Sequence, residues 1–262
     1  MAYIEDRFYF PNSIEVEIKW AGNYGAKGEK RAPKEKPTPE QIEKQNQWRK
    51  ERDVRRLIKA NFKRGDYWIT FVYPQQTRKE IGEVQKDISK LQEKLRYRYK
   101  VWWNAPYKWI NRIEIGSRGG IHCHMLVNAV EGADLDLEIQ TLWNNITGGR
   151  AHFERFMANE DSNIKVANYL VKPLTDQQKK RLEDMDLDPA ELTKYSSSRN
   201  LKRPKPVRKY YRRKTLRKVV ETGEPIETKG YKIDKNSIIF GVNRFTGLSY
   251  LYYTEIADGG EP

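Results

Sequence analysis

Two of the three histidines in this 262-residue chain lie one residue apart in the apolar segment 121–128. Side chains two apart in a β-strand point to the same face, so His122 and His124 would project side by side. Cys123 would then face the opposite side of the strand. Neutral imidazoles bind zinc, manganese, iron and related ions, so the pair forms half of a metal site. The alternative is a pair of half-exposed polar side chains with no ligand.

A carboxylate that could complete this site lies eight residues before His122, at Glu114. The turn at 117–120 folds the chain back, which places Glu114 across from either His122 or His124. Two imidazoles and one carboxylate leave coordination positions open, as a catalytic metal site requires. The alternative for Glu114 is an ordinary cross-strand partner of a histidine.

A tyrosine between two lysines forms the second group of residues that could carry chemistry. In the helical segment 162–173, Lys165, Tyr169 and Lys172 fall on one face at spacings of four and three. Two neighbouring ammonium groups favour the phenolate form of a tyrosine and attract phosphate. With 16 tyrosines in the chain, a surface tyrosine beside solvated lysines is the alternative.

The charge balance points to a polyanionic partner. Lys and Arg number 50 against 36 Asp and Glu, which gives a net charge of +14. Nucleic acid is the first expectation for such a chain and an anionic membrane surface the second. No segment reaches the ~18 apolar residues of a membrane span, and no secretory signal is apparent. The single cysteine excludes an intrachain disulfide, and the absence of a P-loop motif argues against a fused helicase or ATPase.

Strand and helix patterns alternate through the middle of the chain and would position these residues. The pattern runs in this order: strand 66–74, helix 77–98, strands 107–115 and 121–128, helix 135–146, strand 150–156 and helix 162–173. Strands joined as a hairpin and interrupted by helices favour an α+β fold over a doubly wound one. The sequence therefore predicts a central, mostly antiparallel β-sheet with flanking helices.

The flanking segments differ from this core in composition. Residues 1–20 read as an extended arm, 21–37 as a basic linker and 39–60 as a charged helix that begins at a capping box. The intensely basic segment 196–218 is expected to be a phosphate-contacting tail or loop, or else disordered. Residues 229–256 read as a β-hairpin. These features divide the chain into residues 1–60, 61–195 and 196–262.

Three motifs in order resemble the HUH endonucleases, in particular the single-tyrosine Rep class that starts rolling-circle replication of bacterial plasmids and phages. The strand sequence at 68–73 resembles the first motif of that family. His122-Cys123-His124 matches its His-hydrophobe-His motif, and Tyr169-Leu170-Val171-Lys172 its Tyr-x-x-Lys helix. Glu114 stands where relatives often carry an acidic third ligand. The resemblance covers about residues 60–175.

The resemblance implies a ferredoxin-like palm and a site-specific, metal-dependent single-stranded DNA endonuclease and ligase. A divalent ion, Mn²⁺ or Mg²⁺, on His122, His124 and Glu114 would bind the scissile phosphate. Tyr169 would attack it, giving a 5′-phosphotyrosine link and a free 3′-OH. Lys172 would orient the phosphate or offset phenolate charge, with assistance from Lys165. The expected function is DNA nicking and strand transfer that initiates rolling-circle replication.

The same resemblance implies partners and a location. Origin DNA, single-stranded or locally melted, would be the substrate in the bacterial cytoplasm, with host helicase and polymerase acting alongside. A second strand transfer would need the reverse attack by a 3′-OH or a second protomer. Trp102, Trp103, Tyr107 and Trp109 are candidates for base stacking, with core packing expected for at least two of them. The expected DNA-contacting cations are Arg118, Lys202, Arg203, Lys205, Arg208, Lys209, Arg212 and Arg213.

Three other functions stay open at this level. The first keeps the fold and chemistry in a single-tyrosine transposase or a relaxase. The second is a non-catalytic basic protein that binds nucleic acid and carries a structural histidine pair. The third is metal-dependent hydrolysis by an activated water, which would leave no covalent protein–DNA link.

Overall fold

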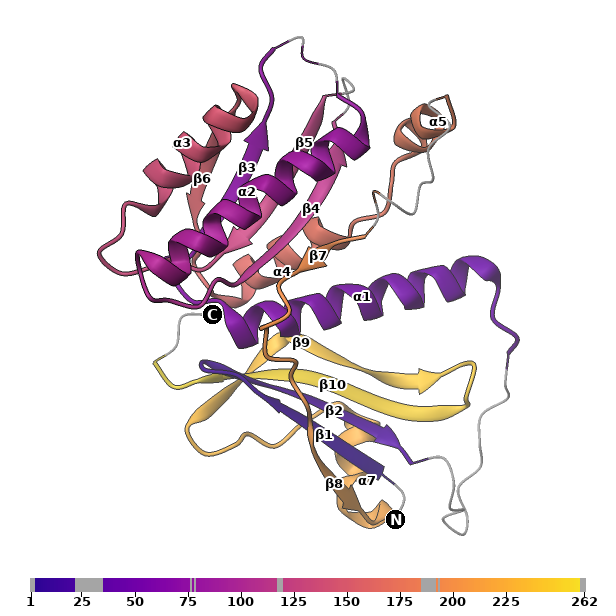
Figure 1. Cartoon of the computed structure of the whole chain (residues 1–262). Coiled ribbons are helices and arrows are strands. Elements are labelled where there is room, and N and C mark those ends of the chain that lie inside the picture. Colours follow the sequence, from indigo (N-terminus) through magenta and orange to yellow (C-terminus); the bar gives the residue numbers. More distant parts are fainter. Residues whose placement is uncertain are drawn as a thin grey trace. The chain divides into compact units, whose positions relative to one another are not determined.

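The computed structural model of the chain describes residues 3–21, 35–75, 77, 79–116, 120–184, 192 and 194–259. It divides into a central unit, Gln47–Lys202, and a terminal unit made of Met1–Asn46 and Arg203–Pro262. Each unit is built around one five-stranded sheet of antiparallel strands (Figure 1). The expected α+β fold is confirmed. None of the described helices is long and apolar enough to cross a membrane.

The central unit follows the order of elements that the sequence predicts. Its strands are β3 (Tyr67–Val72), β4 (Trp109–Ile115), β5 (Ile121–Val127), β6 (Arg150–Arg155) and β7 (Ser196–Ser197). Its helices are α2 (Ile81–Val101), α3 (Leu135–Thr147), α4 (Glu160–Val171) and α5 (Asp176–Asp184), together with α1 (Pro39–Asn61) from residue 47 onward. The strand order β6-β3-β5-β4-β7 gives β3–α2–β4–β5–α3–β6 the split arrangement of ferredoxin-like folds.

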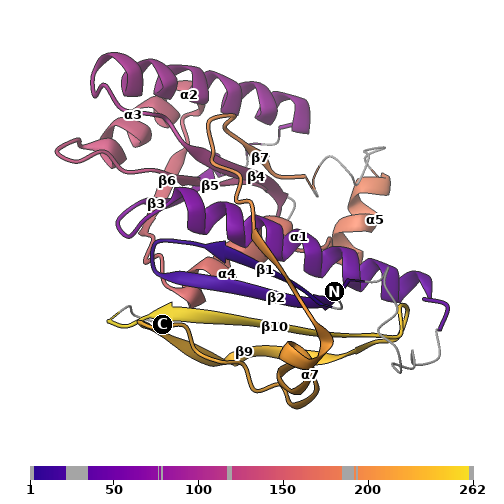
Figure 2. The ribbon, with the colours of Figure 1, turned by 90° about the horizontal axis from the view of Figure 1, so that it is seen from below.

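The two faces of the central sheet differ in chemistry. Helices α2 and α3 cover one face (Figure 2), where Phe71 and Met125 pack against Leu91 and Trp143 in an apolar core. Since strand side chains alternate, Cys123 is buried on this face while His122 and His124 point to the other. The opposite face therefore carries the polar groups of β3, β4 and β5.

Helix α4 packs on the edge of that polar face through its apolar side. Ala167 and Leu170 contact a second core that includes Ile110 of β4 and Leu126 of β5. The N-cap of α4 is Asn159, whose side chain accepts a hydrogen bond from the Ser162 amide. This packing directs the polar side of α4 toward the histidine strand.

The terminal unit joins both ends of the chain in one sheet with the strand order β8-β1-β2-β10-β9. The strands are β1 (Tyr3–Tyr9), β2 (Ser13–Trp20), β8 (Val207–Tyr211), β9 (Tyr231–Asn243) and β10 (Leu248–Ala257), and α7 (Arg213–Thr222) packs on one face. The expected C-terminal hairpin is confirmed as β9 and β10. The pairing of the first strands with the last ones is long-range and has no signal in the sequence.

Two expectations about the flanks were wrong. Residues 3–20 form a hairpin inside the sheet instead of an extended arm, because the apolar side chains of β2 at Ile14, Val16 and Ile18 build its core. The basic segment after residue 196 is a folded strand and helix instead of a tail. Arg208 of β8 donates to both carboxylate oxygens of Asp6 on β1, at 2.6 and 2.9 Å, so the partner strand neutralises the charge. Most of the expected linker, 22–34, lies outside the described residues.

The junction between α3 and β6 requires glycine at residue 149. A Cβ atom there would lie 2.2 Å from the Val72 carbonyl oxygen of β3 and 2.7 Å from Trp143 Nε1. We therefore expect Gly149→Ala to lower the free energy of unfolding by about 1–3 kcal/mol, as overpacking does elsewhere. Gly82→Ala, where a Cβ would meet nothing within 4 Å in α2, is the matched control and should stabilise by about 0.5–1 kcal/mol. Urea denaturation measures both, and equal effects would contradict the close approach.

Candidate active site

The register of the central sheet places the predicted site residues in two adjacent rows. Glu114 on β4 lies directly opposite His122 on β5, which decides between the two pairings left open by the sequence. Thr70 on β3 lies opposite His124. The Glu114 carboxylate nevertheless reaches diagonally, with Oε2 3.4 Å from His124 Nε2. The two rows thus meet at one carboxylate.

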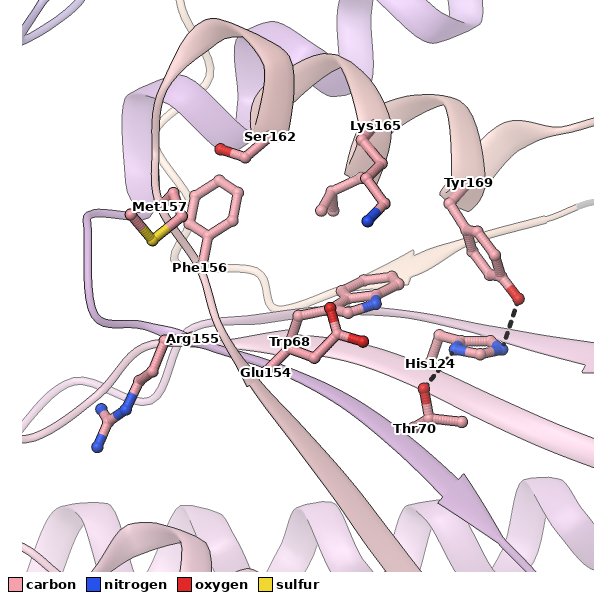
Figure 3. Close-up of a pocket in the computed structure, with 11 residues that line it drawn as sticks. Trp68, Thr70, His124, Glu154, Arg155, Phe156, Met157, Ser162, Lys165 and Tyr169 are labelled. Atoms are coloured by element: carbon pink, nitrogen blue, oxygen red, sulfur yellow. Dashed lines mark hydrogen bonds between the residues drawn. The ribbon is translucent and has the colours of Figure 1, made fainter. Parts of the chain in front are cut away.

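The hydroxyl of Tyr169 joins these groups from α4. It donates a 2.5 Å hydrogen bond to Glu114 Oε2 and lies 3.0 Å from His124 Nε2, a contact that Figure 3 shows. The Lys172 ammonium group pairs with the second oxygen of Glu114 and lies 4.5 Å from the centre of the Tyr169 ring. Tyr169, His124, Glu114 and Lys172 therefore form one connected cluster, called the tyrosine cluster below.

Two residues of β3 orient the His124 ring. Thr70 Oγ1 lies 3.0 Å from His124 Nδ1, which leaves Nε2 for the tyrosine cluster. The indole of Trp68 stacks on the ring with centroids 5.7 Å apart and planes 14° apart. The parity of 68 and 70 in the strand would have placed both residues on the face of the histidines, although the sequence alone does not show which strands are neighbours.

Arg112 was not identified from the sequence and holds the end of α4. This side chain is 2% exposed and donates from Nη1 to the Tyr169 carbonyl oxygen at 3.1 Å and from Nε to the Leu192 carbonyl at 3.2 Å. Burial lowers the pKa of Arg112, an effect that nearby Glu114 opposes. Its spacing of two from Glu114 was the available signal, since both must face the same side of β4.

Lys172 occupies a different place from the one expected. The sequence puts it on the helix, but α4 ends at Val171, and Lys172 has the extended conformation φ −56°, ψ 141°. Pro173 is the physical reason, because proline disfavours the helical conformation of the residue before it. The turn out of the helix lets the ammonium group reach Glu114.

The electrostatics of the cluster favour an ionised carboxyl and a protonated phenol. Burial opposes ionisation of Glu114, yet hydrogen bonds from His124, Lys172 and Tyr169 hold its pKa well below the usual range. Burial and the hydrogen bond to Glu114 raise the pKa of Tyr169 above its ordinary value. The expectation that flanking lysines would favour phenolate was therefore wrong for this arrangement, because the hydroxyl faces an ionised carboxylate.

The donors fit a divalent cation by their chemistry. His122 Nδ1 is buried and has no hydrogen-bond partner in the described part of the chain. Burial, and then the neighbouring His124, lower the pKa of His122, which favours the neutral form that ligates metals. With His124 Nε2 and Glu114 Oε2, the set is two imidazoles and one carboxylate. Among the described residues, however, no group of three or more such side chains converges on one point.

A cavity of about 370 Å³ lies beside the tyrosine cluster (Figure 3). Lys165 lines it one helical turn before Tyr169, so the structure brings these two expected residues together on one side of α4. The other described lining residues come mainly from β3, β6 and the loop into α4, namely Trp68, Thr70, His124, Glu154, Arg155, Phe156, Met157, Ser162 and Val166.

The remaining expected DNA-contacting residues are dispersed. Lys202, Arg203, Lys205, Lys209 and Arg212 are exposed, and Arg208 is paired with Asp6. Arg213 lies in α7, and Arg118 lies outside the described residues. Of the aromatic candidates, Tyr107 and Trp109 are buried in the core, Trp103 packs against it, and Trp102 is exposed with Arg98 3.5 Å from its ring centre.

The ionised state of Glu114 predicts a pH-dependent stability. Because the pKa of folded Glu114 is depressed, its contribution is present above the ordinary carboxyl value of about 4.3 and is lost as the pH falls. We expect Glu114→Gln to cost about 1–2 kcal/mol at neutral pH, with the difference from wild type shrinking below about pH 4. Urea titrations across this range measure it, with exposed Glu93→Gln as control. A difference independent of pH would contradict the assignment.

Comparison with known proteins adds one finding. Residues 66–178 match a family model described as a replication-associated protein of the ORF2 type. No curated protein and no solved structure matches the chain. The matched segment begins directly before β3 and ends in α5, so it contains the whole tyrosine cluster and the cavity. The expected resemblance to Rep proteins is confirmed at this level, and residues 66–178 are a region of this replication-associated protein family.

Proposed function

We propose that this protein initiates rolling-circle replication by nicking single-stranded or locally melted origin DNA with Tyr169 as the nucleophile. The observation that carries the proposal is the Tyr169 hydroxyl, which bonds to Glu114 and lies beside His124 within a segment of a replication-associated family. A tyrosine so placed beside basic and acidic partners is suited to attack phosphorus. The family match supports replication over transposition or conjugative transfer as the biological role.

Cleavage would exchange one phosphodiester bond for another. Tyr169 Oη would form a bond to phosphorus while the bond from phosphorus to the 3′-oxygen breaks, leaving a 5′-phosphotyrosine and a 3′-OH. The phenolic proton must leave Oη, and Glu114 Oε2 at 2.5 Å and His124 Nε2 at 3.0 Å are the acceptors within reach. The departing 3′-oxygen takes up a proton, and its hydroxyl can prime synthesis. The reverse attack would reseal the strand.

The lysines would act on charge. The Lys172 ammonium group lies 4.5 Å from the Tyr169 ring centre and would offset phenolate charge as the proton leaves. Lys165 lines the cavity beside Tyr169 and would bind a phosphate oxygen. A divalent ion, Mn²⁺ or Mg²⁺, held by His122, His124 and Glu114 would supply Lewis-acid stabilisation of the phosphate. The exposed cations after Leu201 would contact flanking phosphates.

The proposal extends to the surroundings of the reaction. The substrate would be met in the cytoplasm of a bacterial host, where a helicase and a polymerase act on the nicked strand. Tyr169 is the only tyrosine in α4. A second strand transfer would then use either the liberated 3′-OH or the tyrosine of a second protomer.

A covalent adduct is the first test. Labelled single-stranded oligonucleotides from the replicon's intergenic region are incubated with Mn²⁺, Mg²⁺ or EDTA and analysed on denaturing gels. We expect a metal-dependent protein–DNA adduct with wild type, none with Tyr169→Phe, and the wild-type amount with Tyr97→Phe, which alters an exposed tyrosine of α2. Cleavage without an adduct would indicate an activated water, and binding without cleavage would indicate a non-catalytic protein.

Metal binding is tested separately from activity. We expect Mn²⁺ titrated calorimetrically to bind wild type, and His122→Gln to weaken binding by about tenfold or more, as loss of a ligand does. His152→Gln is the matched control because His152 is an exposed histidine of β6. Equal Mn²⁺ affinity of wild type and His122→Gln would remove His122 from the ligand set.

A further inference from the structure

The cavity beside the tyrosine cluster has a composition that the proposed chemistry does not use. Its volume of about 370 Å³ lies within the range typical of small-molecule sites. Trp68, Phe156 and Val166 give it apolar walls, while Glu154 and Lys165 place opposite charges at its edges. An apolar slot with a few polar groups is the environment that a planar heterocycle with a polar edge requires.

Trp68 provides a fixed aromatic surface in this cavity. Its indole is held by the stack on His124 and by an edge contact to Tyr169, with ring centres 5.8 Å apart and planes at 78°. Figure 3 shows the indole beneath the Lys165 side chain. Bases of single strands stack on such side chains. The position beside His124 and Tyr169 puts a stacked base next to the reacting phosphate.

Glu154 is the polar group that distinguishes this slot. It lies opposite Trp68 across the β3–β6 ladder, is exposed, and has no hydrogen-bond or ion-pair partner among the described residues. Its neighbour Arg155 is engaged elsewhere, 3.9 Å from the Tyr67 ring centre and donating to the Gly65 carbonyl. A free carboxylate repels phosphate and accepts hydrogen bonds, so it suits the donor edge of a base.

Lys165 makes the opposite contribution at the same cavity. It precedes Tyr169 by one turn of α4, and its ammonium group has no partner in the described part of the chain. Lys165 and Glu154 come from different elements, the helix and the edge strand of the sheet. A nucleotide bound between them would meet a cation with its phosphate and an anion with its base.

We propose that the cavity holds one unstacked nucleobase of the strand being cut, and that Glu154 accepts a hydrogen bond from its exocyclic amino group. Cytosine presents such a donor, whereas thymine presents the O4 acceptor in the corresponding place and is disfavoured. The site therefore reads one base beside the nick and contributes to origin selection. This inference rests on the proposed function for the identity of the ligand.

Equilibrium binding of homopolymers tests the inference without knowledge of the origin. Fluorescein-labelled oligo(dC) and oligo(dT) of about 12 nucleotides present the same base in every register and stack weakly. Anisotropy is measured in EDTA at about 0.2 M salt, which suppresses contacts made to phosphate alone. The proteins are wild type, Glu154→Gln and Glu93→Gln. Both glutamates are exposed, so neither change should disturb folding.

We expect wild type and Glu93→Gln to bind oligo(dC) about tenfold more tightly than oligo(dT), and Glu154→Gln to lose most of this preference. An amide can both donate and accept, so the variant would bind both polymers similarly. No preference in wild type, or a preference that survives Glu154→Gln, would overturn the inference. Adduct formation by Tyr169 in the same wild-type protein separates this failure from failure of the proposed nicking activity.

Discussion

The ionised carboxylate of Glu114 is the group on which the rest of the site depends. Glu114 is 8% exposed, and a charge so far from water is unfavourable unless it is paired and hydrogen-bonded. Three partners meet this need: the Lys172 ammonium group, the Tyr169 hydroxyl and the His124 ring. Two of these come from α4 and the residue after it, so the charge on β4 fixes where the helix must end.

The fold answers this requirement with a sheet whose faces have separate tasks. The apolar face packs on α2 and α3 and makes the strands rigid, while the opposite face carries the reactive groups. Helix α4 is held there by two kinds of contact, the apolar packing of Leu170 and the bond from Arg112 to the Tyr169 carbonyl. A site built on regular elements in this way keeps its geometry better than one built on loops.

The arrangement describes a protonated tyrosine held by the groups that the proposed reaction would use. Burial and the Glu114 bond raise the pKa of Tyr169, so the phenol keeps its proton until this bond changes. Binding of DNA, with its phosphate near Lys165, or of a cation at His122, His124 and Glu114 would alter that bond. In this view the stability of the tyrosine cluster and the reactivity of Tyr169 are opposed, as is common where function requires partly strained or charged groups.

The sequence by itself determined the order of strands and helices, the shared face of His122 and His124, and the membership of Glu114 and Tyr169 in one site, because these follow from local periodicity and from motifs. Tertiary structure decided what periodicity cannot encode. The register chose His122 as the neighbour of Glu114, and Pro173 turned Lys172 out of the helix toward that carboxylate. Arg112 gained its role only when packing brought the Tyr169 carbonyl within reach. The pairing of β1 with β8 joins residues about 200 positions apart, and such contacts depend on the whole chain.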